Sequence, residues 1–99
     1  MEEFNILLEI IKELYNLETD ELITKRRKRV LVELRYVCAN ILKIETKYTL
    51  EFIGEKLNID HSTVSYAIKE HSNLLESKNS RTYFDKFNKI SEAYLHRHI

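Results

Sequence analysis

The sequence contains no proline and no tryptophan, and it has only one glycine and one cysteine among its 99 residues. Proline and glycine are the residues that most often interrupt helices, so their scarcity favours helices joined by short polar turns. Apolar residues recur at helical spacing along almost the whole chain, which supports the same interpretation. We therefore predict one all-α domain over residues 1–99, a single compact helical domain of about five to six helices.

Long hydrophobic runs are also missing. No apolar run approaches the roughly 20 residues that a membrane-spanning helix needs, and the acidic start Met1-Glu2-Glu3 is unlike a signal peptide. We therefore expect a soluble cytoplasmic protein. Cys38 has no second cysteine with which to form a disulfide, and its place on an apolar helix face favours a buried structural thiol.

Patterns typical of catalytic and metal sites are absent as well. Gly54 is the only glycine, which excludes a glycine-rich phosphate loop, and no nucleophile has an evident base beside it. His61 and His71 are about 15 Å apart if they share one helix, and His96 and His98 point to different sides of a chain end. We predict no enzymatic activity, no cofactor and no metal site.

The net charge of zero conceals an uneven distribution along the chain. Residues 1–23 carry one lysine and seven acidic residues, whereas residues 24–43 carry seven lysine or arginine residues and one glutamate. A basic block this concentrated can bind phosphates even when the whole molecule is neutral. We expect the acidic segment to keep the opposite side of the molecule away from DNA.

The densest part of this block is the run Lys25-Arg26-Arg27-Lys28-Arg29, which has no apolar residue to bury. It is expected to be a loop or the frayed start of the next helix. As a functional element it would anchor phosphates and place an arginine in the minor groove. The alternatives are a solvated loop and a nuclear localisation tract. Arg35, about two turns further along, is expected to contact the DNA backbone or to form a surface salt bridge.

Apolar stripes predict helices over about residues 3–16 and 30–44, with one extra turn over residues 19–23 for which Thr19 is the expected cap. A last helix follows a polar break at residues 77–80. Its aromatic stripe is expected to lie in the core, with a partner or self-association surface as the alternative. That stripe consists of Tyr83, Phe84, Phe87, Ile90 and Tyr94.

Residues 49–76 have the pattern of two short helices joined by a tight turn, which is typical of a helix-turn-helix. Thr49 is a suitable N-cap for the first helix, and the second should run from His61 to about Glu76. The apolar faces consist of Leu50, Ile53 and Leu57 in the first helix and Val64, Ala67, Ile68 and Leu75 in the second.

The residues between these helices have the properties that a tight turn needs. Gly54 has no side chain, so a second element can approach closely. Asn58 tolerates the left-handed conformation at a helix end, and Ile59 is expected to enter the core. Asp60 is expected to cap the second helix with its carboxylate.

The outward side chains at the start of the second helix are suited to reading base edges in the major groove. Serine and threonine hydroxyls bond several bases, a threonine methyl packs on the thymine methyl, and histidine can donate to guanine N7. Asp60 could accept from a cytosine amino group. The alternative is an ordinary solvated face. The candidate DNA contacts here are Asp60, His61, Ser62, Thr63, Ser65, Tyr66 and Lys69.

With these motifs in place, the chain resembles the C-terminal DNA-binding domain of the bacterial replication initiator DnaA over nearly its full length. The tract Leu22-Ile23-Thr24-Lys25-Arg26-Arg27 is similar to the family's leucine–serine–lysine–arginine–arginine tract. The similarity continues through Thr49-Leu50-Glu51-Phe52-Ile53-Gly54 and, most specifically, Asp60-His61-Ser62-Thr63-Val64. The resemblance implies sequence-preferring binding of double-stranded DNA in replication initiation or its regulation.

The resemblance also implies roles for the matching residues. Arg27 corresponds to the arginine that enters the minor groove, and Arg35 to a phosphate contact. Asp60, His61, Ser62 and Thr63 correspond to the group that reads bases and backbone in the major groove. Thr49, which opens the middle matching tract, joins these candidate contacts, as do Lys25, Arg26 and Arg29 of the basic run.

The chain departs from the family pattern in two places. The family usually has glycine–glycine–arginine–aspartate before the histidine, whereas this chain has the shorter Asn58-Ile59-Asp60. The nucleotide-binding motor domain is absent, so we expect no ATPase activity, and the start at Met1 favours a stand-alone protein. We expect a monomer that binds double-stranded DNA and takes replication proteins as a further class of partner. The alternatives are a transcriptional repressor that dimerises through its last helix and an interaction module that docks on a host replication protein.

Overall fold

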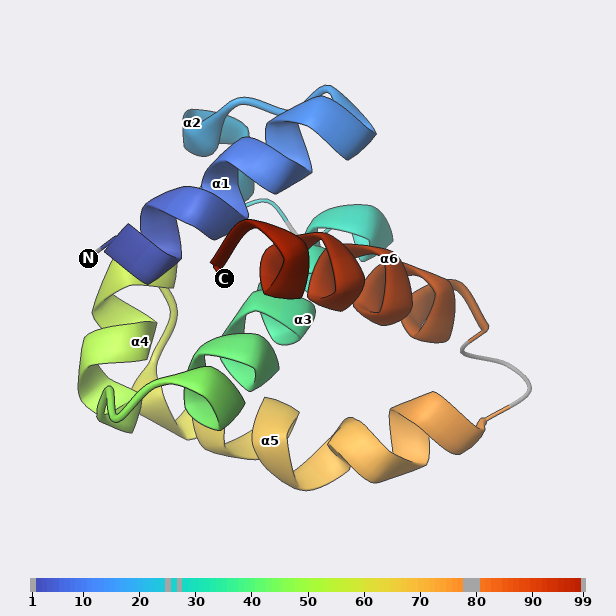
Figure 1. The fold of residues 1–99 in the computed structure, drawn as a ribbon. Helices are drawn as coiled ribbons and strands as arrows, with labels where there is room; N and C mark the ends of the chain where they lie inside the picture. Colours follow the sequence, from blue (N-terminus) through green and yellow to red (C-terminus); the bar gives the residue numbers. More distant parts are fainter. Residues whose placement is uncertain (1, 25, 27, 78–80, 99) are drawn as a thin grey trace.

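The computed structural model describes residues 2–24, 26, 28–77 and 81–98. Within these ranges the regular structure is entirely helical, which confirms the predicted all-α fold with a helix-turn-helix (Figure 1). The second helix of the motif has the predicted bounds. In chain order the helices are α1 (Glu2–Tyr15), α2 (Thr19–Leu22), α3 (Arg29–Glu45), α4 (Leu50–Leu57), α5 (His61–Glu76) and α6 (Arg81–His98).

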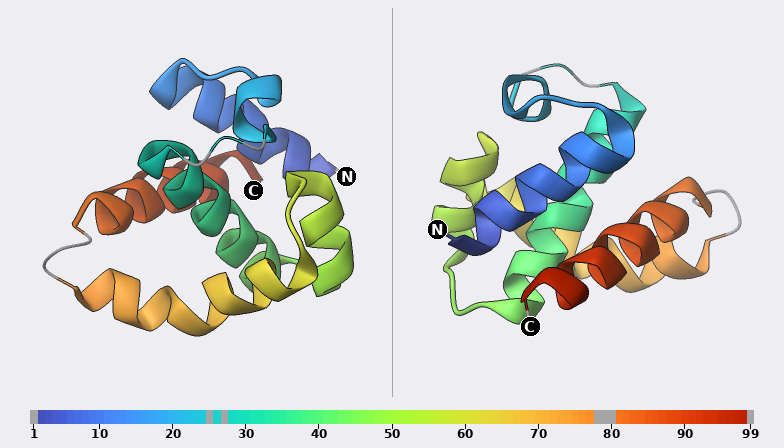
Figure 2. Two further views of the ribbon diagram at one scale, coloured as in Figure 1. Left: turned by 180° about the vertical axis from the view of Figure 1, so that it is seen from behind. Right: turned by 45° about the horizontal axis from the view of Figure 1, so that its top comes forward.

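Helix α3 is the centre of the fold, because each of the other helices packs against it. Figures 1 and 2 show α1 and α6 crossing on one side of α3, with the α4–α5 pair on the other. The stripe of α3 that faces these neighbours is buried and includes Leu34, Val37, Cys38, Ile41 and Leu42. The fold therefore holds the helix-turn-helix on a scaffold made by the other helices. No helix in the described ranges is long and apolar enough to cross a membrane.

Cys38 is fully buried, as predicted. Burial raises the pKa of its thiol to about 12, because the thiolate would lose its hydration inside the apolar core. The side chain therefore acts as a small packing group in the centre of α3.

The aromatic stripe of α6 is only partly as predicted. Tyr83, Ile90 and Tyr94 are buried, and Phe87 packs against the same core. Phe84, in contrast, is 42% exposed, so its predicted place in the stripe is wrong. The reason is helical geometry, since successive residues point about 100° apart and Tyr83 occupies the inward direction.

One polar cluster lies inside this core and joins α3, α5 and α6. The Asn40 side-chain amide donates to the carbonyl oxygens of Tyr36 (3.0 Å) and Ala67 (3.1 Å), and it lies 3.3 Å from the Tyr83 hydroxyl. His71 Nδ1 is 2.7 Å from the same hydroxyl. Buried polar groups are stabilising only when they find such partners, so this cluster fixes how the three helices meet.

The start of α2 differs from the prediction. Thr19 is the first residue of the helix, and Glu18 occupies the N-cap position. The backbone N–H of Glu18 donates to the Glu21 carboxylate at 3.1 Å, which is half of a capping box. The predicted cap at Thr19 is therefore wrong by one residue, because an acidic pair takes this role.

Candidate nucleic-acid interface

The turn between α4 and α5 is built as the sequence predicts. The Thr49 hydroxyl accepts a hydrogen bond from the Phe52 N–H (3.1 Å), and Asn58 ends α4 in the left-handed conformation with φ 59° and ψ 43°. A Cβ atom on Gly54 would lie 2.6 Å from the carbonyl oxygen of Ile59. Only glycine leaves room for the turn to fold back this closely, so Gly54 sets the angle between the two helices.

Asp60 occupies the N-cap position of α5, but its carboxylate makes no capping hydrogen bond. The predicted side-chain cap is therefore wrong. The N–H of Thr63, which a capping carboxylate would normally satisfy, already donates to the backbone carbonyl of Asp60 at 3.0 Å. The consequence is an exposed carboxylate at the start of α5 that is available to a ligand.

The first turns of α5 present a polar face. Val64 and Ala67 are buried, whereas the side chains between them point outward or lie at the margin. Tyr66 is 54% exposed, and its ring meets that of Tyr36 edge-on at 6.3 Å between centroids. Of the predicted contacts on this helix, His61, Ser62, Ser65, Tyr66 and Lys69 are exposed and Thr63 is half-buried.

The basic run connects α2 to α3. Lys25 and Arg27 lie outside the residues that the structure describes. Arg26 and Lys28 are exposed, as is Arg29, whose Nε lies 3.3 Å from a carboxylate oxygen of Glu33 one turn further along α3. The described part of the run therefore presents cations to solvent, as expected of a phosphate-binding segment.

Arg35 is buried, with only 5% of its surface exposed, so the alternative of a surface salt bridge is wrong, and its contact with the DNA backbone stays a prediction. Its Nε donates to the carbonyl oxygen of Leu22 (2.6 Å), and its two terminal nitrogens donate to those of Thr24 (2.6 Å) and Arg26 (2.9 Å). Burial lowers the pKa of the guanidinium. Its position four residues after buried Leu31 places it on the inward side of α3, but this spacing gives no sign of the carbonyl oxygens that it meets there.

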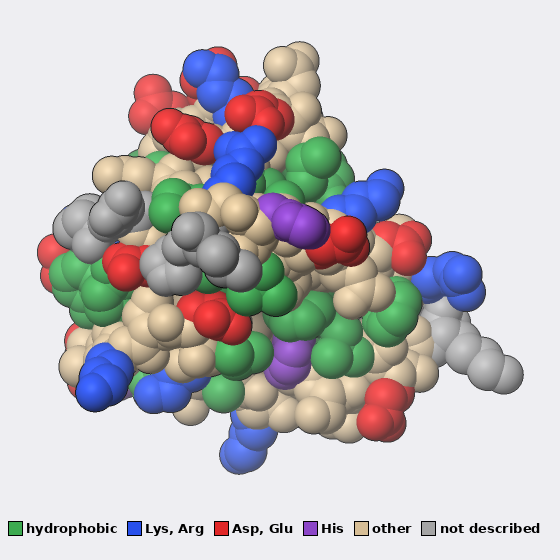
Figure 3. Space-filling view, in the orientation of Figure 1, with side chains coloured by type: hydrophobic (Ala, Val, Ile, Leu, Met, Phe, Trp, Pro, Cys, Tyr) green, Lys and Arg blue, Asp and Glu red, His purple; other side chains and the backbone are tan. Residues whose placement is uncertain are grey.

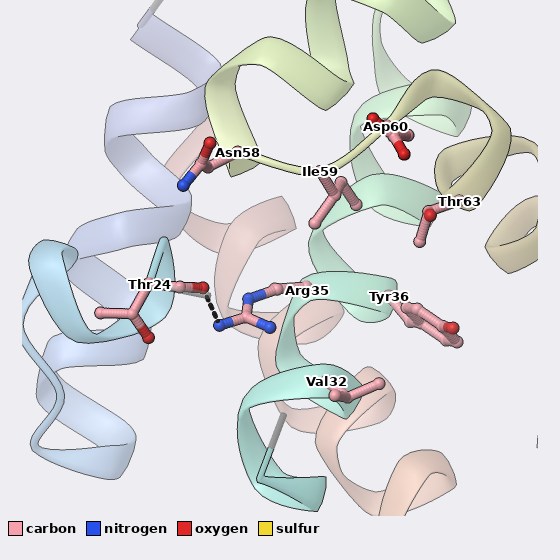
Figure 4. A pocket seen from close by; sticks show the side chains of 8 residues that line it. All are labelled: Thr24, Val32, Arg35, Tyr36, Asn58, Ile59, Asp60 and Thr63. Carbon is pink, nitrogen blue, oxygen red and sulfur yellow. Dashed lines mark hydrogen bonds between the residues drawn. The ribbon is translucent and has the colours of Figure 1, made fainter. Parts of the chain in front are cut away.

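A second tether joins the basic segment to the turn. The Asn58 side chain donates to the carbonyl oxygen of Ile23 at 2.8 Å. Between the two elements lies a pocket of about 190 Å³, and Figure 4 shows Arg35 in its floor between Thr24 and the start of α5. Its lining consists of Thr24, Val32, Arg35, Tyr36, Asn58, Ile59, Asp60 and Thr63. Thr24, which immediately precedes the basic run, and the start of α5 thus line one hollow.

Asn58 and Tyr36 are among the residues of this hollow that were not predicted to be part of the site. Asn58 was expected only to end a helix, and Tyr36 was not singled out at all. Neither has a sequence signal of its own, because both enter the site through contacts with segments that are remote in the sequence.

The acidic and basic segments are not on opposite sides of the molecule as expected. Asp20 and Glu21 line a second pocket, of about 310 Å³, together with Arg26 and Lys28. Figure 3 likewise shows acidic and basic side chains interspersed on one face. Acidic groups therefore border the basic segment on its α2 side, where they weaken its attraction for phosphates.

Comparison with known proteins agrees with this geometry. The family model of the bacterial DnaA protein helix-turn-helix matches residues 5–70. The chain belongs to this DnaA helix-turn-helix family. The match runs from α1 into α5 and leaves α6 outside it.

Curated DnaA relatives show the same similarity. The chain is 32% identical over 75 residues to the chromosomal replication initiator protein DnaA of Mycoplasma pneumoniae, which covers 76% of the chain and 17% of that protein. It is 38% identical over 64 residues to that of Rickettsia bellii, covering 64% and 14%. The chain therefore spans about a sixth of the length of these relatives. No solved structure shows significant similarity to it.

Proposed function

We propose that the chain binds double-stranded DNA with a sequence preference, in replication initiation or its regulation. The observation that carries the proposal is the hollow lined by Thr24, which immediately precedes the basic run, and by Asp60 and Thr63 at the start of α5. A duplex lying across it would receive α5 in the major groove and the basic segment in the adjacent backbone or minor groove. The name shared by the relatives supports replication initiation as the setting.

The exposed side chains of α5 supply the base contacts in this proposal. His61, Ser62 and Ser65 provide hydrogen-bonding groups, and the Thr63 methyl can pack on a thymine. The Asp60 carboxylate, which makes no cap, can accept from a cytosine amino group.

The remaining candidates would contact the DNA backbone. Lys69 and Tyr66 lie further along the same exposed face of α5, and Thr49 is exposed at the start of α4. Among the basic residues, Arg26 and Arg29 supply exposed cations, and Lys25 and Arg27 are proposed from the sequence alone. Such contacts position the protein without reading sequence.

The chain is proposed to bind DNA without hydrolysing ATP, because its sequence has no glycine-rich phosphate loop. It is also proposed to act as a monomer. Phe84 and Leu95 are exposed on one face of α6, but the exposed polar residues Asn88 and Glu92 interrupt that face. An apolar patch broken in this way is a poor dimer interface.

The test is selection of bound sequences from a random duplex pool, followed by affinity measurements on the selected site. His61→Ala and Thr63→Ala should each reduce the preference for that site over random DNA by about 1–3 kcal/mol. Ser72→Ala, on an exposed position near the far end of α5, is the matched control and should change nothing. Equal affinity of the unaltered protein for every duplex would overturn the sequence preference, and absence of binding would overturn the proposal.

The exposed Phe84 and Leu95 favour one second candidate, a transcriptional repressor that dimerises through α6. Sedimentation at micromolar concentration separates the two. A dimer that dissociates in a Phe84→Ser variant would support the repressor, and a monomer would support the first proposal.

A further inference from the structure

We infer that Arg35 and Asn58 are positioning residues that hold the basic segment in place beside α5. In this inference Arg35 supports DNA binding through that segment, without its own contact to a phosphate. The inference rests on the proposed function, and it assigns to Arg35 a role different from the one that the family resemblance implies.

The position of Arg35 is the first argument. Its guanidinium is almost fully buried and donates to three carbonyl oxygens: those of Leu22 at the end of α2, of Thr24 just before the basic run, and of Arg26 within it. A planar guanidinium with five N–H donors is the side chain best able to hold several acceptors at fixed angles. These hydrogen bonds are internal to the protein, so the guanidinium already has its partners before DNA binds.

Asn58 adds a tether from the opposite direction. Its amide donates to the carbonyl oxygen of Ile23, which lies between two of the carbonyl groups held by Arg35. Arg35 comes from α3 and Asn58 from the helix-turn-helix, so the segment is fixed to both the scaffold and the turn (Figure 4). The spacing between the two proposed DNA-contacting elements is thereby set in the free protein.

Leu22 is buried and Ile23 packs against the core, but the residues that follow them have no such anchor. Residues 24–29 include no apolar side chain that could anchor it in the core. A polar segment of this kind would otherwise lose backbone freedom on meeting DNA and weaken the complex accordingly. The two tethers hold the backbone carbonyl groups of residues 22–24 and of Arg26 beforehand, and they leave the side chain of Arg26 exposed.

The experiment compares Arg35→Lys, Arg35→Gln and Asn58→Gly by DNA affinity as a function of salt. Lysine keeps the charge, but its donors all sit on one nitrogen and cannot span the three carbonyl groups that the planar guanidinium reaches, so both Arg35 variants should lose affinity alike, roughly 10- to 100-fold. Asn58→Gly keeps the left-handed turn and removes only the amide, and it should lose affinity by a smaller factor. Recovery of most of the affinity by Arg35→Lys would overturn the inference, because a phosphate contact requires only the charge.

The same substitutions are then made in a Lys25→Ala, Arg26→Ala, Arg27→Ala background at low salt. If Arg35 acts through the segment, Arg35→Gln should now cost less than about twofold and leave the salt slope unchanged. A further fall in affinity, with a slope smaller by about 0.9, would identify a direct phosphate contact and overturn the inference.

Amide hydrogen exchange of the DNA-free proteins provides a readout that does not depend on binding. Arg35→Lys and Asn58→Gly should each speed exchange of the residue 22–26 amides while leaving α5 unchanged. Unaltered exchange there would overturn positioning even if DNA binding holds. If exchange is faster in the variants but the unaltered protein binds no DNA, the proposed function is overturned and the tethering role of Arg35 and Asn58 still holds. If Arg35→Lys fails to fold, as judged by circular dichroism, Asn58→Gly decides alone.

Discussion

The Nδ1 atom of His71 lies 2.7 Å from the hydroxyl oxygen of Tyr83, which ties the second half of α5 to α6. The imidazole ring also meets the Phe87 ring edge-on at 4.6 Å between centroids. Burial lowers the pKa of His71, because the charged imidazolium would lose hydration in this aromatic setting. The folded protein therefore favours the neutral form of His71.

This relationship predicts that stability falls on mild acidification. The pKa of His71 lies near its ordinary value of 6.5 in the unfolded chain and below it in the folded chain, so the unfolded chain binds more protons between the two values. The contribution of neutral His71 to the free energy of unfolding is therefore complete above about pH 7 and decreases as the pH falls below 6.5. Urea unfolding at pH 7.5 and 5.5 should show a smaller difference in His71→Gln than in the unaltered protein.

The control is His96→Gln, at an exposed position, which should keep the pH dependence of the unaltered protein. Glu3 and Glu33 do not interfere, because their pKa values are lowered from 4.5 and they titrate in a more acidic range. An unchanged pH dependence in His71→Gln would contradict the assignment.

Gly54→Ala is expected to destabilise the protein, although alanine ordinarily favours helices by about 1 kcal/mol over glycine. The added Cβ would lie 2.6 Å from the Ile59 carbonyl oxygen, so the turn must shift. We expect a net loss of about 1–3 kcal/mol in the free energy of unfolding. Denaturant unfolding measures it, with Glu55→Ala as the exposed neighbour that should change stability by less than about 0.5 kcal/mol. A stabilised Gly54→Ala protein would show that the close approach does not exist.

The Cys38 thiol is expected to be unreactive in the folded protein. It is fully buried, and its pKa is raised to about 12, so neither access nor the thiolate form is available at pH 8. A maleimide reagent should label it only as fast as the protein unfolds, and urea should restore labelling at the rate of a free thiol. Fast labelling of the native protein would contradict the packing of α3.

Arg26→Ala is expected to weaken DNA binding on all sequences and to reduce the salt slope by about 1, because an exposed cation of the basic run would be lost. Lys89→Ala, which removes an exposed cation from α6, is the charge-matched control and should keep the slope. Titrations at several salt concentrations give both values. Equal slopes for Arg26→Ala and the unaltered protein would place the DNA elsewhere.

The features that sequence alone predicted are those set by local geometry. Thr49 and Asn58 act at the ends of α4 as expected, and Gly54 permits the close turn. Each depends on neighbours within a few residues, so spacing and residue type suffice to predict it. The bounds of α5 follow for the same reason.

The features that sequence missed depend on remote contacts. Arg35 turns inward because carbonyl oxygens 9 to 13 residues away need donors, and an isolated helical stripe does not show them. The Asp60 carboxylate does not cap α5, because the backbone carbonyl of Asp60 accepts the hydrogen bond from the Thr63 N–H. In both cases a backbone acceptor decided the outcome, and hydrophobic periodicity contains no information about backbone acceptors.

The Asn40 amide has a further consequence for α5. Apolar surfaces can slide over one another by a fraction of an ångström at little cost, whereas a directional bond to the Ala67 carbonyl oxygen cannot. The axial register of α5 against α3 is therefore set by one side chain near its middle. The exposed residues of α5 therefore keep the same position along the helix axis, relative to the scaffold, whenever a partner binds.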